Sequence, residues 1–412
     1  MLSVDQALEL IFRQSRPLAP RRVGLPDALG LVLAEEIVSD IDSPPHDKSV
    51  VDGYAVQAAA VKVAGTKLSI LEEVTAGRLP TLAVSATTAT RIMTGAPLPA
   101  GADAIVMIEK TEFASGQESL VCINEFPVKL GQNIMRQGTS MRQGEIVLSS
   151  RCPAGASTTL RAIEIGLLAE VGRQEVLVHP CPQVAVLATG DELVDAAQIP
   201  GPAQIRNSNG PMIAAQVRQA GGIPRELGIA RDSQADLKKC IQSGLESDVL
   251  ILSGGVSAGV LDLVPQVLES LGVEQVFHKV NLKPGKPLWF GVQTNANGRR
   301  VLVFGLPGNP VSSLVCFELF IRPALAALAG RPFCGLPIQS GLLTKEQRQR
   351  GDRPTYWPAS CLLDGTGATV TPLEWRGSGD LHSLARANCL AYFPAEDRVF
   401  AAGEKVSVYL LE

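Results

Sequence analysis

The sequence contains few histidines, and its cysteines do not occur in closely spaced pairs. The 412 residues include four histidines and eight cysteines, and no two cysteines form a Cys-x-x-Cys pair. Cysteines scattered in this way, without histidines at fixed spacings from them, exclude a disulfide framework and the common zinc sites. This cysteine usage fits a reducing compartment, so we expect a cytoplasmic protein.

Two further absences concern charge and hydrophobic length. The formal net charge is −4, whereas nucleic-acid-binding proteins usually carry a basic excess, so we expect no nucleic acid partner. The longest apolar runs, such as Val249 to Leu252, are only strand-sized, and we therefore expect no membrane partner. The N-terminus does not read as a signal peptide, because Ser3-Val-Asp-Gln6 resembles a capping box at the start of a helix.

Hydrophobic residues make up 46% of the chain, and a chain of this length is expected to form about two to four domains. The first forty residues look helical and then extended up to Pro44-Pro45. Residues 45 to 145 are rich in Val, Ile, Thr and turn signals, which is typical of a β-rich module. From about residue 180 to Gly330, strands alternate with helices, which predicts βαβ units on a mostly parallel sheet. Short alternating strands beyond Gly330 predict a small C-terminal β-domain.

Three predicted strands of the α/β part end in unusual sequences. In an open α/β sheet, ligands bind at the carboxyl ends of the strands. These ends read Thr189-Gly-Asp-Glu192, Ser253-Gly-Gly255-Val-Ser257 and Gly305-Leu-Pro-Gly308-Asn-Pro310. Glycines let the backbone approach a ligand, and the N–H groups of a following helix favour anions. Together the three ends predict a ligand that contains phosphate.

Each strand end alone has a simpler explanation. Ser253-Gly-Gly is also a common tight turn, and an acidic residue after a strand is often a helix cap. None of the ends matches Gly-x-Gly-x-x-Gly or a Walker A loop, which disfavours nicotinamide enzymes and ordinary ATPases. The carboxylates of Glu192, Asp232 and Asp262 are candidates for holding Mg²⁺ against phosphate oxygens.

Polar segments outside the three strand ends have two interpretations each. Lys283-Pro-Gly-Lys286-Pro287 presents two cations on a backbone stiffened by proline, but it also fits a solvated surface turn. The glycine-bearing turns around Asp52 and Thr94 lie in the β-rich module, where they either join the site or only pack that module.

The order of these motifs resembles the molybdopterin molybdenumtransferase family, which includes MoeA and the E domain of gephyrin. The resemblance extends over essentially the whole chain. It rests on Ser49-Val-Val-Asp-Gly-Tyr-Ala55, Ile92-Met-Thr-Gly-Ala-Pro97, Thr189-Gly-Asp-Glu-Leu193, Ser253-Gly-Gly-Val-Ser257, Lys283-Pro-Gly-Lys-Pro287 and Leu306-Pro-Gly-Asn-Pro310. Residues His46, Lys48 and Val50-Val51 depart from the family's pattern at positions that flank a motif.

The resemblance implies an α/β plus β fold in four parts. These are an elongated linker domain (1–44 and 145–178), an inserted β-rich domain (45–144), a mostly parallel α/β molybdopterin-binding domain (179–330) and a C-terminal β-barrel-like domain (331–412). It implies a Mg²⁺-dependent transferase that inserts molybdate into adenylyl-molybdopterin and releases AMP, in the last step of molybdenum cofactor biosynthesis. A homodimer and transient contact with a molybdopterin adenylyltransferase are also implied.

The resemblance further implies which residues form the site. The implied catalytic residues are Asp52, Thr94, Glu192, Asp232 and Asp262, and the last three would also bind the metal. The implied substrate-binding residues are Ser253, Gly254, Gly255, Ser257, Lys283, Lys286, Pro307, Gly308, Pro310, Arg353 and Ser378.

Two other functions stay open at this point. A molybdopterin adenylyltransferase shares the α/β domain and its Ser-Gly-Gly loop, but that family is usually a single compact domain. A non-catalytic scaffold is the other, because the E domain of gephyrin also anchors receptors. An assay that separates AMP formation from AMP release, and one for turnover with molybdate, distinguish the three.

Overall fold

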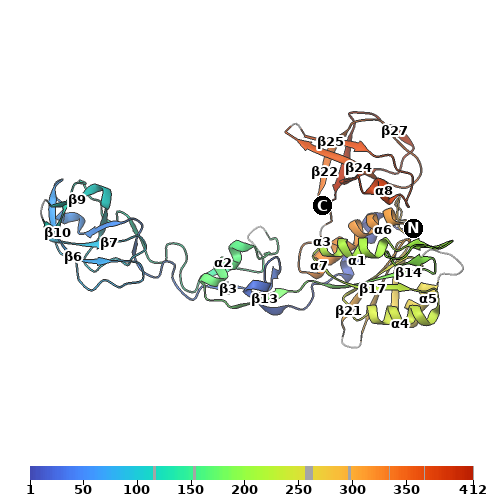
Figure 1. Cartoon of the computed structure of the whole chain (residues 1–412), viewed down its shortest axis with the longest axis horizontal. Coiled ribbons are helices and arrows are strands. Elements are labelled where there is room, and N and C mark those ends of the chain that lie inside the picture. The colour runs from blue at the N-terminus through green and yellow to red at the C-terminus, as the bar shows by residue number, and fades with distance from the viewer. Residues whose placement is uncertain are drawn as a thin grey trace.

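The protein is elongated, with three bodies that follow one another along its longest axis (Figure 1). The computed structural model describes residues 1–114, 117–151, 155–255, 263–295, 298–333, 335–365 and 367–411. A β-rich part forms one end, a small domain lies in the middle, and the α/β part with the C-terminal β-part beside it forms the other end (Figure 1). Two predicted site residues, Ser257 and Asp262, lie outside the described residues.

The β-rich end is a six-stranded sheet with the strand order β8-β5-β7-β6-β10-β9. Its elements are β5 (Gly53–Val56), η2 (Ala58–Ala60), β6 (Thr66–Val74), β7 (Thr88–Ile92), β8 (Ala104–Met107), η3 (Ile108–Lys110), β9 (Thr111–Ala114) and β10 (Gln117–Ile123). Its core contains Tyr54, Leu68 and Val106. The abundance of β-branched residues that predicts this module fits the pleated, half-buried surface they occupy.

Two passes of the chain connect this end to the middle domain, and two aspartates fasten the passes to each other. Asp42 accepts hydrogen bonds from the backbone N–H of Gln143 at 2.8 Å and from the side-chain amide of Gln137 at 2.7 Å. Asp47 accepts from the backbone N–H of Gln137 at 2.9 Å and forms an ion pair with Arg136. These bonds lower the pKa of both carboxyl groups. The two passes are therefore held together as a pair.

The middle domain is built around a three-stranded sheet with the order β1-β13-β2. The domain and the connection contain β1 (Arg21–Gly24), η1 (Leu25–Asp27), β2 (Val32–Leu33), β3 (Ile37–Val38), β4 (Lys48–Ser49), β11 (Ile134–Met135), β12 (Ile146–Leu148), α2 (Ala162–Glu170) and β13 (Glu175–His179). Leu33, Leu168 and Val176 are buried in its core.

The α/β domain has a six-stranded sheet with the order β17-β14-β18-β21-β20-β19. The elements are β14 (Gln183–Thr189), β15 (Leu193–Val194), β16 (Ile205–Arg206), α3 (Asn209–Gln219), β17 (Ile223–Ala230), α4 (Gln234–Gly244), β18 (Val249–Ser253), α5 (Leu263–Ser270), β19 (Val273–His278), β20 (Trp289–Thr294) and β21 (Arg300–Leu306). The first four strands in the sheet order are parallel, whereas β20 runs antiparallel to both of its neighbours, β21 and β19. This arrangement confirms the predicted mostly parallel α/β fold.

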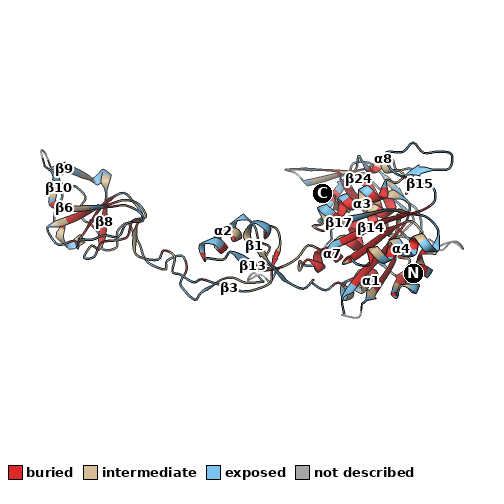
Figure 2. Ribbon diagram, turned by 60° about the horizontal axis from the view of Figure 1, so that its bottom comes forward, coloured by how far each residue is buried: buried red, intermediate tan, exposed pale blue. Residues whose placement is uncertain are grey.

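Buried residues concentrate in this sheet and in the helices beside it (Figure 2). Successive residues of β14 face opposite sides, as the alternation of a strand requires. Val184 and Val186 belong to the apolar cluster that includes Ile213 of α3. Ala185 and Leu187 belong to the cluster that includes Leu237 of α4. The sheet is thus covered on both faces, which explains why its strands read as continuous apolar runs.

A long apolar helix spans Pro310–Leu328, which is 19 residues. It comprises α6 (Pro310–Cys316), the π-helical segment η4 (Phe317–Ile321) and α7 (Arg322–Leu328). This segment is longer than the strand-sized runs considered in the sequence analysis, and it is apolar enough to cross a membrane. However, 89% of its most apolar stretch is buried inside the protein, so it is a core helix of the α/β domain.

The C-terminal domain is a closed barrel in which β22, β25, β24, β26 and β28 follow one another. Its elements are β22 (Ile338–Leu343), β23 (Gln347–Gln349), β24 (Thr355–Asp364), β25 (Gly367–Pro372), α8 (Leu381–Leu384), β26 (Cys389–Phe393), β27 (Arg398–Phe400) and β28 (Lys405–Leu410). Backbone hydrogen bonds join it to the α/β domain, from Lys283 N–H to Pro354 O at 2.8 Å and from Val311 N–H to Ser378 O at 3.0 Å.

Helix α1 (Val4–Gln14) begins with the predicted capping box. The Ser3 hydroxyl accepts from the Gln6 backbone N–H at 3.1 Å, and the Gln6 side chain accepts from the Ser3 N–H at 2.9 Å. Ala7 and Ile11 are fully buried in the α/β core. The division implied by resemblance places residues 1–44 in the linker domain, whereas this helix packs on the α/β domain.

Candidate functional site

The carboxyl ends of β14, β18 and β21 meet at a cavity of about 490 Å³, here called the strand-end cavity. Five predicted site residues line it: Glu192, Ser253, Gly254, Gly308 and Pro310. The predicted residue Gly255 follows in the same turn, with φ at 64°. The loops that follow the three strands therefore line one cavity.

Gly254 must be glycine for two separate reasons. Its φ is +99°, and a Cβ atom at this position would lie 2.6 Å from the carbonyl oxygen of Thr189. Both the left-handed backbone and the close approach of β14 exclude larger residues.

We expect Gly254→Ala to destabilise the protein by at least about 1 kcal/mol more than Gly228→Ala does, because only Gly254 has backbone in contact. Gly228 is the matched control, since it has φ +78° and nothing within 4 Å of its would-be Cβ. Urea unfolding of the two variants measures the difference. Equal losses would show that φ strain alone matters at Gly254.

The predicted carboxylates lie on the loop after β14 and on the neighbouring loop after β17. Asp191 and Asp232 exchange hydrogen bonds, from Asp191 N–H to Asp232 at 3.3 Å and from Asp232 N–H to Asp191 at 3.1 Å. Arg231 braces the same loop by donating to the carbonyl oxygens of Asp191 at 3.1 Å and Leu193 at 3.0 Å. Glu192 and Asp232 are both exposed.

Carboxylate oxygens are suitable ligands for Mg²⁺, but these side chains do not form a complete set of protein ligands. In the described part of the chain, no group of three or more His, Cys, Asp or Glu side chains could hold a metal ion. Mg²⁺ is commonly bound by one or two carboxylates, with waters and substrate phosphates as the remaining ligands. Glu192 lines the strand-end cavity, whereas Asp232 does not line it and is hydrogen-bonded to Asp191, the residue next to Glu192.

A second cavity, of about 520 Å³ and here called the cationic cavity, lies between the α/β domain and the barrel. The predicted residues Lys283, Lys286, Pro307, Arg353 and Ser378 all line it, together with Arg376, Trp357 and Trp375. Gly285 is required between the two lysines, because its φ is +117° and a Cβ there would lie 2.5 Å from Cys316 Sγ.

The cationic cavity carries a local excess of positive charge. Within the described ranges, Lys283, Lys286 and Arg376 form no ion pair with a carboxylate, and Arg353 has only the exposed Asp352 at 3.9 Å. The charge of Arg376 also acts on the Asp380 carboxylate, whose pKa it helps to lower. The protein as a whole is acidic, with a net charge of −4. Four cations around one cavity in an acidic protein indicate an anion-binding site.

Asn309 separates the two cavities, since it lines both. Its side-chain amide donates to the Ser378 hydroxyl at 2.9 Å. Gly379, the next residue, lines the strand-end cavity, whereas Gly377 and Ser378 line the cationic cavity. Two loops in contact thus divide one polar region into two compartments. Asn309 precedes helix α6, but its side chain makes no capping hydrogen bond there, and its contact with residue 378 leaves no local signal in the sequence.

The carboxylate of Asp380 stabilises the barrel loop that contains Ser378 and Gly379. The carboxylate accepts from the Ser383 hydroxyl, the Ser383 N–H at 3.0 Å and the Arg376 N–H at 3.1 Å. These bonds, that of the Ser383 hydroxyl first, lower its pKa to about 2. Because the folded pKa lies below the ordinary value of 3.8, the carboxylate stabilises the fold above pH 3.8 and loses that effect as pH falls towards 2.

We therefore expect the difference in Tm between the parent and Asp380→Asn to shrink as pH falls from about 5 to about 2. Thermal unfolding followed by circular dichroism at several pH values measures this difference. A difference that stays constant across that range would contradict the role of the ionised carboxylate.

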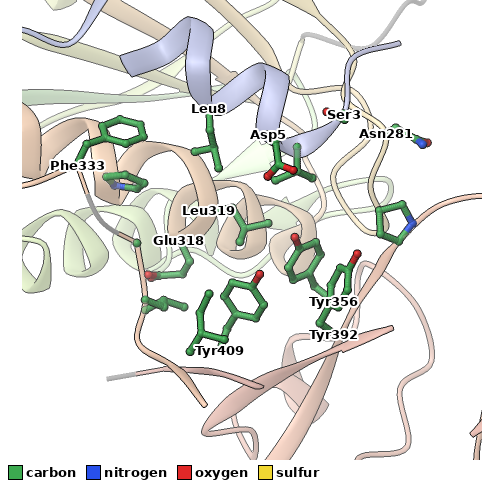
Figure 3. A pocket seen from close by; sticks show the side chains of 16 residues that line it. Ser3, Asp5, Leu8, Asn281, Glu318, Leu319, Phe333, Tyr356, Tyr392 and Tyr409 are labelled. Carbon is green, nitrogen blue, oxygen red and sulfur yellow. The ribbon is translucent and has the colours of Figure 1, made fainter. Parts of the chain in front are cut away.

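A third cavity, of about 420 Å³, lies among helix α1, segment η4 and the barrel (Figure 3). The ring centroid of Tyr356 lies 5.3 Å from those of Tyr392 and Tyr409. None of the predicted site residues that the structure describes lines it. It marks the joint where the barrel packs on the α/β domain.

Comparisons with known proteins agree along the whole chain. Residues 2–172 match the family described as MoeA N-terminal region (domain I and II), residues 185–327 the probable molybdopterin binding domain, and residues 341–411 the MoeA C-terminal region (domain IV). A molybdopterin molybdenumtransferase of Staphylococcus aureus is 33% identical, and the alignment covers 100% of this chain and 96% of that protein. The chain belongs to the molybdopterin molybdenumtransferase family. The family identified from the motif order is thereby confirmed.

Two other relatives of this family extend the likeness. A molybdopterin molybdenumtransferase of Staphylococcus epidermidis is 32% identical with the same coverage of both chains. The crystal structure of a molybdopterin biosynthesis MoeA protein from Pyrococcus horikosii is 30% identical, covers 100% of this chain and 99% of its own, and has a TM-score of 0.83. The four-part fold predicted by resemblance to the molybdopterin molybdenumtransferases is thus that of a solved relative.

Asp52 and Thr94, predicted as site residues of a molybdopterin molybdenumtransferase, lie together but far from both cavities. Asp52 accepts from the Thr94 N–H at 2.7 Å and from its hydroxyl at 2.8 Å. The Thr94 N–H, and then its hydroxyl, lower the pKa of Asp52. They flank β5 and β7 in the β-rich end, whereas the cavities lie beside α6 at the opposite end (Figure 1). Within one chain these two residues do not reach the cavities.

Proposed function

We propose that this molybdopterin molybdenumtransferase acts on adenylyl-molybdopterin and molybdate, releasing AMP as molybdenum enters the pterin dithiolene. The observation that carries this proposal is the pair of adjoining polar cavities, which share Asn309 as a lining residue and meet at its hydrogen bond to Ser378. A substrate with a phosphoanhydride and a separate oxyanion needs two neighbouring anion sites of this kind.

The strand-end cavity suits the phosphates of the adenylylated pterin. The glycine turn at Gly254 lets the backbone lie close to a ligand, and helix α6 begins beside the cavity at Pro310 with the positive end of its dipole. The N–H groups of Gly254 and Val311 themselves donate to Leu306 O and Ser378 O. The hydroxyl of Ser253 lies in the same cavity. Fixed donors of this type stabilise negative charge that develops on phosphate oxygens when AMP leaves.

The cationic cavity suits molybdate. Lys283, Lys286 and Arg353 attract the dianion, and the Ser378 hydroxyl has a hydrogen to donate, because its oxygen accepts from Asn309. Because Asn309 lines both cavities, an oxyanion in the cationic cavity would lie near an anhydride in the strand-end cavity. Water cleaves the P–O–P bond, so that its oxygen is bonded to one phosphorus and the bridging oxygen stays on the other, and AMP and the molybdopterin phosphate separate. Molybdenum forms two Mo–S bonds with the dithiolene sulfurs, and one oxo ligand of molybdate leaves as water with the two sulfur-bound protons.

Mg²⁺ would be held by Glu192 and Asp232, with the predicted ligand Asp262 as the third carboxylate. When bound it would neutralise charge on the phosphate oxygens. A cytoplasmic homodimer that receives its substrate from a molybdopterin adenylyltransferase completes the proposal. The dimer is supported by the distance of Asp52 and Thr94 from the cavities of their own chain (Figure 1).

The test is incubation with adenylyl-molybdopterin, molybdate and Mg²⁺, followed by chromatography for AMP. We expect AMP release that depends on molybdate. Consumption of ATP with formation of adenylyl-molybdopterin would instead identify an adenylyltransferase, and no turnover would identify a scaffold. Either result would overturn the proposal.

A further inference from the structure

Asn209, the first residue of helix α3, is outside the predicted set, yet it joins two of the strand-end loops. Its side-chain nitrogen Nδ2 donates to Ser253 Oγ at 2.8 Å and to the carbonyl oxygen of Gly308 at 2.7 Å. Only 8% of the residue is exposed. A carbonyl oxygen can only accept, so the amide atom that faces Gly308 must be the nitrogen. The orientation of the amide is therefore fixed by chemistry.

This orientation determines what the Ser253 hydroxyl can do. Both hydrogens of the Asn209 amide are used, so Ser253 Oγ accepts in this bond and keeps its own hydrogen. In the described part of the chain, that hydrogen has no acceptor. Ser253 lines the strand-end cavity, and a ligand oxygen there would accept the hydrogen.

Two neighbouring polar atoms also lack partners. Among the residues that the structure describes, Asn209 Oδ1 and Thr189 Oγ1 are buried without a hydrogen-bond partner. The two residues are 8% and 3% exposed, and both line the same cavity. Buried polar atoms are almost always hydrogen-bonded in native proteins, so such atoms beside a cavity indicate groups kept for a ligand. These two unpartnered atoms are an observation independent of the hydrogen bonds of Asn209 Nδ2, and they also indicate a bound molecule.

The local role of a helix cap does not explain Asn209. The start of α3 is already served by Asn207, whose side-chain oxygen accepts from the Gly210 N–H at 2.9 Å. Asn209 instead contacts residues 44 and 99 positions away. Its bonds connect loops and leave the helix start unaffected.

We propose that Asn209 is a positioning residue, which holds the Ser253 and Gly308 loops together and directs the Ser253 hydroxyl towards a phosphate oxygen of the ligand. The assignment rests on the proposed function, in which this cavity binds the phosphates of adenylyl-molybdopterin. AMP, the phosphate-bearing product, is the probe for its test.

The test is titration calorimetry with AMP and Mg²⁺ on the full-length protein. Asn209→Ala and Ser253→Ala should each weaken AMP binding at least about tenfold, as expected for a lost hydrogen bond to a charged group. The double variant should bind AMP about as weakly as Asn209→Ala alone, because the serine hydroxyl is already misdirected in that variant.

Asn207→Ala is the matched control, because it removes the same type of side chain from the lining of the same cavity but breaks only a local bond. It should lower Tm as a lost helix cap does, and its effect on AMP binding should add to that of Ser253→Ala. Additivity for Asn207 and non-additivity for Asn209 distinguish a positioning role from a structural one.

Three outcomes would overturn the assignment. One is parental affinity for AMP in Asn209→Ala, and another is an additive effect of the Asn209 and Ser253 substitutions. If Asn209→Ala does not fold, Asn209→Asp replaces it, because it keeps the shape of the side chain without an N–H to donate. Parental affinity for AMP in Asn209→Asp is the third outcome. A parent protein that binds no AMP would refute the proposed function first, and the positioning role with it.

Discussion

Two inactive variants, Asp52→Ala and the double variant Lys283→Ala/Lys286→Ala, should restore each other's activity when they are mixed. The reason is the distance between the Asp52–Thr94 pair and the two cavities of the same chain (Figure 1). If the β-rich end of one subunit completes the cavities of its partner, a mixed dimer has one site with both lesions and one with neither. Random pairing from equal amounts should then return about a quarter of the parental activity.

The matched control mixes Asp52→Ala with Thr94→Ala. Both lesions lie in the β-rich end, so every site of a mixed dimer keeps one lesion and no activity should return. AMP release after co-expression or refolding measures both mixtures, and light scattering confirms the dimer. Activity in the control mixture, or none in the first mixture at any ratio, would refute the shared site.

The strand-end cavity could be predicted from sequence because its signals are local. Continuous apolar runs such as Val249–Leu252 mark strands buried on both faces, and the glycines that follow mark backbone turns at their ends. Parallel strands bring such ends to one edge of a sheet, so the convergence of Glu192, Ser253 and Gly308 follows from topology alone. The ordered motifs then identified the family.

The side-chain hydrogen bonds between loops could not be predicted in the same way. Asn209, Arg231 and Asn309 each act through contacts with residues distant in the chain. A single asparagine at a helix start has the same local sequence whether it caps the helix or reaches another loop. Only the folded backbone distinguishes the two.

The edge strand β19 of the α/β sheet was likewise not identified from the sequence. Strand β19 contains Glu274 and Gln275, which are exposed, and it lacks the continuous apolar run of a central strand. It pairs with β20 through a register shift between Gln275 and Phe277. An edge strand with one open face and a bulge has weak periodicity, which hides it from sequence analysis.

Removing the charge of Lys286 should raise KM for molybdate about 10- to 100-fold, because charge-assisted bonds to an anion are stronger than neutral ones. Lys286 is exposed, lines the cationic cavity and has no carboxylate partner in the described ranges. Its charge is therefore available to a ligand. Lys286→Met removes the charge and keeps an extended side chain, so the fold should be unaffected.

Two control variants are needed. One tests whether the charge or the packing of Lys286 matters, and the other tests whether any lost positive charge on the protein would have the same effect. Lys286→Arg keeps the charge and should stay within a few-fold of the parent, although the arginine geometry differs from that of a lysine. Lys405→Met removes one positive charge from an exposed position on strand β28 of the barrel, which lines neither cavity. It should leave KM for molybdate unchanged.

AMP binding distinguishes the two cavities in the same experiment. Because Lys286 lines the cationic cavity and not the strand-end cavity, Lys286→Met should bind AMP with nearly parental affinity while its KM for molybdate rises. The parental KM itself should rise with ionic strength, since salt screens the attraction between the cations and the dianion. A Lys286→Met variant that loses AMP affinity but keeps its KM for molybdate would reverse the assignment of the two cavities.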